Sequence, residues 1–268
     1  MCCAMIDFIC SWALFFGLAL TFVTYAGRRM LVGRASNDRL EGVEGALLGR
    51  NLIEGAYWCF QPLVSFLELL RVSPNMVTGL ALIPMSGAAL AAGTGHFGIG
   101  AILATAGSLC DMLDGLLARR QGVASAAGEV FDAAADRYAE FFVLAGIAVF
   151  SRDSPPLLLL SLAALLGSFM VSYTTAKAEA MDVDPPKGAM RRATRAFYIL
   201  VAMGLVPWWQ AWGPAWERGW GSAPVAKVLH YAPLSLSLAV VAVVTNASAV
   251  RRLYQTAQLT RELQMPGK

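Results

Sequence analysis

Charged residues are scarce in this chain of 268 residues: they make up 15% of it, against 57% hydrophobic residues, and the mean hydropathy is +0.57. Soluble domains carry about 25% charged residues. The composition therefore excludes an ordinary soluble protein and predicts a multi-pass protein of the lipid bilayer. The net charge of +3 is small and no nucleic-acid-binding motif accompanies it, so we expect no nucleic-acid partner.

Paired cysteines and a cleavable leader are also missing. The five cysteines are odd in number, and most lie in apolar surroundings without ligand-like partners, which argues against a disulfide framework and against a zinc site. The N-terminus lacks a basic region and a small-residue cleavage site. We therefore expect the apolar run at 8–27 to be a retained membrane span.

Long apolar runs are what the chain has instead. A helix needs about 20 apolar residues to cross a bilayer, and the candidates are 8–27, 75–93, 97–119, 129–150, 155–178, 193–212 and 230–250. The mixed stretch at 51–71 predicts a helix in the membrane interface, and Ser73-Pro74 marks the turn into the next span. The predicted fold class is all-α, an integral membrane helical bundle.

Basic residues gather on one side of these spans. Almost all of the 21 lysines and arginines fall in segments that alternating spans place together, whereas the opposite side holds only Arg152, Arg218 and Lys227. Cytoplasmic segments of membrane proteins are enriched in lysine and arginine. The distribution therefore predicts an N-terminus outside and a C-terminus in the cytoplasm.

Four aspartates stand near the cytoplasmic ends of two neighbouring spans. Asp111 and Asp114 are spaced i, i+3 and Asp132 and Asp136 i, i+4, so each pair shares a helix face, and a hairpin through "RRQGVASAAG" brings the pairs together. Four carboxylates in a low-dielectric site repel one another unless cations neutralise them. Hard oxygen ligands favour Mg²⁺ or Mn²⁺, and the four could hold two ions suited to clamping a pyrophosphate.

Two other interpretations of these acids stay open. Any single aspartate could be an ion-pair partner or a helix cap, and Asp132 could be a first-turn acid favoured by the helix dipole. The alternative of another class is a cation or proton transporter, which predicts acids spread along a path through the membrane and often internal repeats. Here all four cluster at one edge and the sequence has no such repeat, which favours a metal-dependent enzyme.

The stretch from Asp111 to Asp136 resembles the signature of the CDP-alcohol phosphatidyltransferase family, D-x-x-D-G-x-x-A-R, eight residues, then G-x-x-x-D-x-x-x-D. Every defined position is present: Asp111, Asp114, Gly115, Ala118, Arg119, Gly128, Asp132 and Asp136. "RVSPNMVTGL" also resembles the start of the family's first core helix. The resemblance implies a six-helix core within a membrane domain at 51–258. An extra transmembrane helix and polar segment at 1–50 precede it, and a cytoplasmic tail at 259–268 follows.

The resemblance also implies an activity and roles for residues. Family members act in phospholipid biosynthesis and transfer a phosphatidyl group from CDP-diacylglycerol to an alcohol, here a polyol, releasing CMP. By this resemblance the metal ligands are Asp111, Asp114, Asp132 and Asp136, with Asp136 also the catalytic general base. The CDP-lipid site is assigned to Asn75, Thr78, Gly115, Ala118, Arg119 and Gly128. A homodimer in the cell's inner membrane, with a cytoplasmic active site, is implied as well.

The acceptor has to be inferred from residues outside the signature. The stretch at 172–197 resembles "SYxRARAE" and "GxxERxxR" in members that take a phosphorylated acceptor, which assigns acceptor binding to Lys177, Arg192 and Arg195. Topology alone would also place basic residues here. Thr175 and Arg191 depart from the pattern, since they replace a basic residue and an acid. The stretch favours inositol phosphate or inositol over glycerol 3-phosphate, the acceptor of phosphatidylglycerophosphate synthases, and both over serine.

Overall fold

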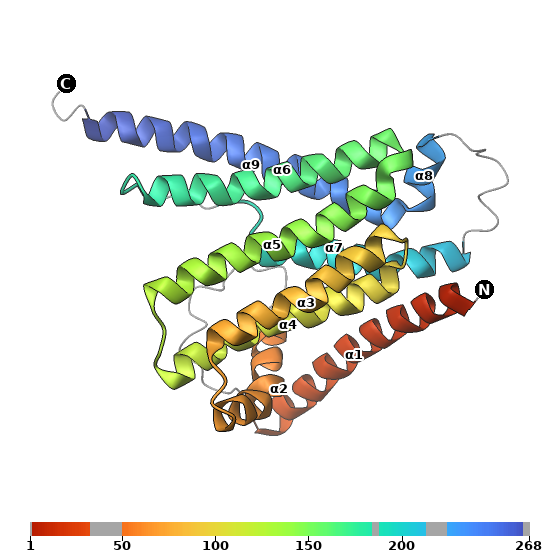
Figure 1. Ribbon diagram of the computed structural model, residues 1–268, viewed down its shortest axis with the longest axis horizontal. Coiled ribbons are helices and arrows are strands. Elements are labelled where there is room, and N and C mark those ends of the chain that lie inside the picture. The colour runs from red at the N-terminus through yellow and green to blue at the C-terminus, as the bar shows by residue number, and fades with distance from the viewer. Residues whose placement is uncertain (1, 33–49, 184–187, 213–223, 265–268) are drawn as a thin grey trace.

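The structure is a computed structural model that describes residues 2–32, 50–183, 188–212 and 224–264 (Figure 1). These residues form no strand, so the all-α fold class is confirmed. The helices are α1 (Cys2–Val32), α2 (Arg50–Leu69), α3 (Pro74–Gly93), α4 (Phe97–Gln121), α5 (Ala126–Phe150), the 3-10 helix η2 (Ser151–Asp153), α6 (Pro155–Glu179), α7 (Arg192–Trp212), α8 (Pro224–His230) and α9 (Ala232–Gln264).

Local sequence signals begin and end the helices that carry the signature. Ser73 caps α3, with Pro74 at the first helical position. Helix α4 ends before Gly122, whose φ of 67° lies in the left-handed region that favours glycine. Ser125 then caps α5 by accepting a hydrogen bond from the Gly128 amide at 3.2 Å. The resulting short turn between α4 and α5 carries the aspartate pairs back to the same end of the bundle.

The helices pack in two groups that are connected by α7 and by direct packing of α5 on α6. Helices α3, α4 and α5 pack together, α6 packs along α9, and α7 contacts both α4 and α9 (Figure 1). Glycines permit the closest approaches: an added Cβ at Gly146 would collide with the Ala89 carbonyl oxygen, and one at Gly167 would collide with the Thr245 hydroxyl. The α4–α5 turn and the C-terminal ends of α6 and α9 lie at the same end of the molecule.

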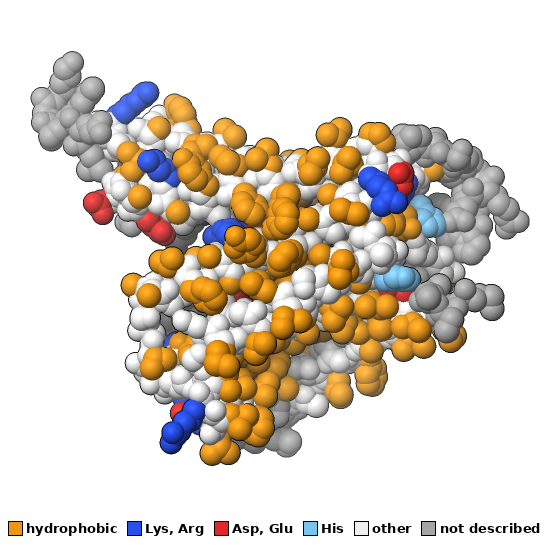
Figure 2. Space-filling model, in the orientation of Figure 1, with side chains coloured by type: hydrophobic (Ala, Val, Ile, Leu, Met, Phe, Trp, Pro, Cys, Tyr) orange, Lys and Arg blue, Asp and Glu red, His pale blue; other side chains and the backbone are white. Residues whose placement is uncertain are grey.

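The outer surface suits a lipid bilayer. Five helices are long and apolar enough to cross a membrane, at Met5–Arg28, Pro74–Gly93, Phe97–Gln121, Pro155–Glu179 and Ala232–Arg261. Helices α5 and α7 occupy the other two expected spans and pack in the same bundle. Large apolar side chains such as Leu166, Leu236 and Val243 face outward. Figure 2 shows this hydrophobic surface across the middle, with most charged side chains toward the two ends.

The first helix is a packed part of the bundle. Asp7 of α1 is buried, and its Oδ1 accepts a hydrogen bond from the Ile99 amide at 2.9 Å. Because His96 makes no side-chain cap, this acid from another helix satisfies an amide in the first turn of α4 and complements its dipole. The rings of Trp12 and Trp208, 4.1 Å apart, join α1 to α7. The extra helix therefore helps to hold the signature helix in place.

Helix α2 packs against the C-terminal end of α4, which is the end expected to face the cytoplasm. Glu68 pairs with Arg120 at 2.9 Å, and Val64 is buried in a small cluster with Leu113 and Leu117. These contacts fix the helix that was expected at the interface against the helix that carries Asp111. Part of the polar segment expected before it, residues 33–49, lies outside the described residues, and the domain boundaries at 50 and 258 stay predictions.

Candidate active site

Three of the four signature aspartates form a compact group of carboxylates. Oxygens of Asp111, Asp114 and Asp132 lie within 4.8 Å of one another, with α4 supplying the first two and α5 the third. The Asp114 side chain is buried, and the Oδ1 atom of Asp132 is buried without a hydrogen bond from any described residue. An unsatisfied buried carboxylate oxygen is costly, and a divalent cation is the ligand that best compensates it. The donor set therefore fits Mg²⁺ or Mn²⁺.

Asp136 lies one turn beyond Asp132 and contacts a basic residue. Its Oδ1 forms an ion pair with Nη1 of Arg192, the first residue of α7. The same guanidinium donates to Asp111, from Nη1 to Oδ2 at 3.0 Å and from Nη2 to Oδ1 at 3.3 Å. Arg192 thus bridges acids of α4 and α5, and all four aspartates belong to one charged site.

Thr78 supports this site from α3. Its hydroxyl donates a hydrogen bond to Oδ2 of Asp114 at 2.5 Å, and both side chains are buried. Thr78 was predicted to line the CDP-lipid site, and the structure places its hydroxyl on Asp114, a carboxylate of the group that could hold a metal ion. A hydrogen bond to such a ligand fixes its orientation.

Replacing Thr78 with valine is expected to weaken Mn²⁺ binding about 10- to 100-fold, the usual loss when a partner of a metal ligand is removed. Valine keeps the shape of threonine and removes only the hydroxyl that holds Asp114. Manganese titration followed by electron paramagnetic resonance measures the change. Thr94→Val is the matched control, because Thr94 caps the other end of α3 and, among the described residues, its hydroxyl bonds only to carbonyl oxygens in the last turn of that helix. Equal affinities in the two variants would contradict this role.

The residues predicted for the nucleotide flank the acids. Asn75 of α3 is exposed, and its Oδ1 would lie 3.8 Å from a Cβ added at Gly128 of α5. On α4 the exposed Arg119 folds back along its own helix, with Nη1 3.4 Å from where a Cβ at Gly115 would lie. Glycine at both positions leaves room for these polar groups. Ala118, on the same turn as Arg119, is half-buried.

The predicted acceptor residues have three different environments. Arg192 lies among the aspartates, and Lys177 is exposed in the last turn of α6. Arg195 is 1% exposed and holds Glu140 through two bonds, Nε to Oε1 at 2.7 Å and Nη2 to Oε2 at 3.0 Å. Such a bidentate ion pair between buried groups fixes α7 to α5. Arg192 and Arg195 lie one turn apart on α7 but pair with different acids, and among the described residues Lys177 forms no ion pair or hydrogen bond with either.

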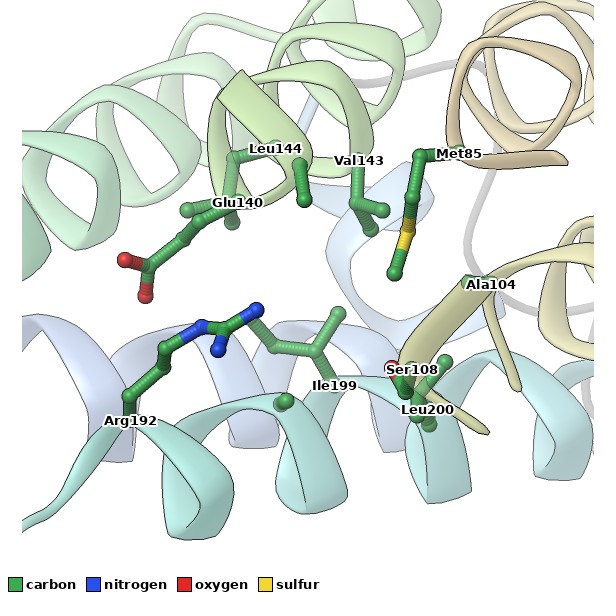
Figure 3. Close-up of a pocket in the computed structure, with 11 residues that line it drawn as sticks. Met85, Ala104, Ser108, Glu140, Val143, Leu144, Arg192, Ile199 and Leu200 are labelled. Carbon is green, nitrogen blue, oxygen red and sulfur yellow. The ribbon is translucent and has the colours of Figure 1, made fainter. Parts of the chain in front are cut away.

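A cavity opens beside this pair. Figure 3 shows Arg192 and Glu140 facing each other across it, with Ser108 of α4 at another wall. The rest of the lining is largely apolar: Met85, Ala104, Ala139, Val143, Leu144, Ala196, Ile199 and Leu200. The cavity thus joins the charged site to the interior of the bundle between α3, α4, α5 and α7.

Two residues near the predicted acceptor residues were missed by reasoning from the sequence. Glu140 follows Asp136 by one helical turn, so its spacing could have indicated a place on the same face. Arg252 of α9 gave no such signal, because it reaches Thr175 across 77 positions, with Nη1 2.6 Å from the hydroxyl oxygen. Its Nε is buried without a hydrogen bond, it packs against Gly188, and no carboxylate among the described residues forms an ion pair with it.

Comparison with known proteins now identifies the family. A family model described as CDP-alcohol phosphatidyltransferase matches residues 71–245. The chain belongs to this family. The expected enzyme class, its place in phospholipid biosynthesis and its use of a divalent metal are therefore confirmed, and the transporter alternative is set aside.

Curated relatives carry a more specific name. A phosphatidylinositol phosphate synthase of Mycolicibacterium smegmatis is 38% identical over 109 residues, which cover 40% of this chain and 49% of that protein. The enzyme of the same name from Corynebacterium glutamicum is 31% identical over 164 residues, covering 59% and 75%. The match thus spans about half the length of the first relative and three quarters of the second.

Solved structures resemble this phosphatidyltransferase over most of the bundle. The Mycobacterium tuberculosis phosphatidylinositol phosphate synthase with CDP-DAG bound gives a TM-score of 0.60 at 27% identity, covering 73% of this chain and 92% of that one. The complex of that enzyme with manganese and citrate gives 0.61 at 26% identity, covering 73% and 88%. The membrane-enzyme fold is confirmed by this likeness. A homodimer stays a prediction.

Proposed function

We propose that this CDP-alcohol phosphatidyltransferase transfers the phosphatidyl group of CDP-diacylglycerol to inositol phosphate and releases CMP. The observation that carries the proposal is the cluster of Asp111, Asp114 and Asp132 with Arg192 bound at its edge. It combines ligands for divalent cations with a guanidinium suited to a phosphorylated acceptor. The names of the relatives support this acceptor over glycerol 3-phosphate.

The reaction assigns a task to each group. The acceptor hydroxyl oxygen attacks the lipid-side phosphorus of the diphosphate, the bond from that phosphorus to the bridging oxygen breaks, and CMP leaves with the electron pair. Asp136 takes the hydroxyl proton, and Arg119 with Asn75 holds the nucleotide end. When bound, one or two Mg²⁺ or Mn²⁺ ions held by the aspartates offset the charge on the diphosphate. Buried surroundings strengthen each of these electrostatic contacts.

Arg252 supports a phosphorylated acceptor. It brings a guanidinium to Thr175, the position that is basic in the "SYxRARAE" stretch that the sequence resembles, and it lies near enough to Arg195 for their positive charges to repel. A cation with a buried Nε that lacks a hydrogen bond favours an anionic ligand. We therefore assign Arg252 with Arg192 and Lys177 to the acceptor phosphate, and Arg195 to positioning α7.

Arg252→Gln is expected to raise KM for inositol 1-phosphate about 10- to 100-fold, because a hydrogen bond to a charged group contributes about 1.5–3 kcal/mol. The KM for CDP-diacylglycerol is expected to stay within about threefold, since Arg252 lies on α9, away from the nucleotide residues of α3 to α5. Initial rates of CMP release measure both constants. Arg251→Gln, at the exposed neighbouring position, is the control. An unchanged KM for the acceptor would exclude Arg252 from its site.

The acceptor is tested by incubating the purified protein with CDP-diacylglycerol, Mg²⁺ and one acceptor at a time. Inositol 1-phosphate is expected to give the highest rate of CMP release, above inositol, glycerol 3-phosphate and serine. Activity with glycerol 3-phosphate and none with either inositol compound would establish the alternative, a phosphatidylglycerophosphate synthase. Activity with inositol alone would remove the role of the arginines as a phosphate site.

The orientation belongs to the same proposal. An enzyme that uses a cytidine nucleotide and a polyol phosphate needs its site on the cytoplasmic side of the inner membrane, where the positive-inside rule puts the α4–α5 turn. Single cysteines introduced into a cysteine-free variant test this in intact cells. A cysteine at Gln121 is expected to be shielded from an impermeant maleimide and one at Thr94 to react. The reverse pattern would overturn the orientation.

A further inference from the structure

Arg192 binds two of the carboxylates that are predicted to be metal ligands. Both oxygens of Asp111 accept hydrogen bonds from its guanidinium, at distances of 3.0 to 3.3 Å, and Asp136 is its second partner. Asp111 is also one of the three residues whose oxygens group tightly enough to hold a cation. A guanidinium and a divalent cation repel each other and cannot fill the same coordination space. Metal binding at Asp111 and Asp136 therefore requires Arg192 to move.

The fold lets the Arg192 side chain move while its helix stays in place. Arg192 is the first residue of α7, and its partly exposed side chain lines the cavity (Figure 3). Three residues later, Arg195 is buried and forms a bidentate ion pair with Glu140. The helix is thereby anchored next to a long, partly exposed side chain. A guanidinium fork binds carboxylate and phosphate with the same geometry, so it has two suitable partners in this site.

We infer that Arg192 couples metal loading to acceptor binding: cations at Asp111 and Asp136 displace its guanidinium, which then binds the phosphate of the acceptor. Only the second step of this inference, the binding of Arg192 to the acceptor phosphate, rests on the proposed function. Because coupling between two ligands is reciprocal, the bound acceptor phosphate must also strengthen metal binding by holding Arg192 away from the carboxylates. The enzyme then completes its charged site only when both ligands are present.

The first test measures Mn²⁺ binding to the full chain in detergent without substrates, by electron paramagnetic resonance. Arg192→Gln removes the competitor and is expected to lower the Kd for Mn²⁺ about tenfold or more, since a unit charge within 4 Å of the acids is lost. Arg191→Gln is the matched control, because it removes an exposed neighbouring charge that forms no ion pair with an aspartate among the described residues. An unchanged or higher Kd in Arg192→Gln would overturn the inference.

A second variant guards against loss of folding. Arg192→Lys keeps the charge but replaces the fork by a single ammonium, which cannot bond both acids in the same way. Its Kd for Mn²⁺ is expected to lie between those of the parent and Arg192→Gln. If Arg192→Gln does not elute as a folded protein on size exclusion, the lysine variant decides: a Kd equal to or above that of the parent would overturn the exchange.

The second test measures the coupling by calorimetry with inositol 1-phosphate as the probe. In the parent protein, saturating Mn²⁺ is expected to tighten inositol 1-phosphate binding about 5- to 100-fold, a usual range for coupled sites. In Arg192→Gln the metal is expected to lose most of this effect. Equal coupling in both proteins would overturn the inference. If Mn²⁺ binding tightens in Arg192→Gln but only glycerol 3-phosphate shows coupling, the exchange stands and the proposed acceptor fails.

Discussion

Asp132→Asn is expected to reduce CMP release from CDP-diacylglycerol by about three orders of magnitude or more, since the metal ions contribute several kcal/mol of charge stabilisation. The position of Asp132 supports so large an effect. Its Oδ1 is buried without a hydrogen bond, and its carboxylate meets those of Asp111 and Asp114 from the opposite helix. Asparagine keeps the size of the side chain but removes the charge and half of the oxygen donors.

Two measurements make the result specific to the metal. Mn²⁺ binding followed by electron paramagnetic resonance is expected to weaken together with activity. Glu129→Gln is the control, because Glu129 is an exposed acid of the same helix, one turn before Asp132, and stands outside the metal group. Its activity is expected to stay within about threefold of the parent, as for surface changes generally. Turnover in Asp132→Asn within tenfold of the parent would contradict the assignment of this aspartate as a ligand.

Much of this site could be predicted from the sequence because its signals are local. The spacings within Asp111–Asp114 and Asp132–Asp136 place each pair on one helical face, and a short hairpin must bring two such faces to the same end. The helices confirm this, since α4 spans Phe97–Gln121 where 97–119 was expected, and α5 spans Ala126–Phe150 where 129–150 was expected. Caps at Gly122 and Ser125 lie in the same short stretch.

Contacts between distant segments could not be predicted in this way. Asp7 accepts a hydrogen bond from the amide of Ile99, 92 positions further along the chain. Arg195 forms an ion pair with Glu140, 55 positions away. No periodicity within a segment reports which side chains of two helices meet, because that depends on the crossing of the whole bundle. The resemblance placed Arg195 with the acceptor residues, and this stays a prediction. The buried pair of Arg195 with Glu140 supports our proposal that it positions α7.

Asp136 is the residue for which the two predicted roles, metal ligand and general base, can be separated. It lies outside the compact group of Asp111, Asp114 and Asp132, and its Oδ1 contacts Arg192. A residue that mainly moves a proton contributes about 10²- to 10⁴-fold to the rate. Asp136→Asn is therefore expected to lower kcat by that factor, while the remaining three aspartates keep Mn²⁺ binding within about tenfold of the parent, as the second metal position alone is weakened.

The comparison of Asp136→Asn with Asp132→Asn decides between these roles. Both variants keep the side-chain volume, and both positions lie on one face of α5, so a packing defect would affect them alike. Loss of Mn²⁺ binding in Asp136→Asn equal to that in Asp132→Asn would make Asp136 a ligand first and would remove the reason to call it the base. Retained Mn²⁺ binding with lost turnover, and loss of the acidic limb in the pH dependence of kcat, would establish proton transfer. The acidic limb must vanish in that case because asparagine has no carboxyl group to titrate. The loss of a metal ligand alone would leave the pH dependence of kcat unchanged and would raise only the metal concentration that activity requires.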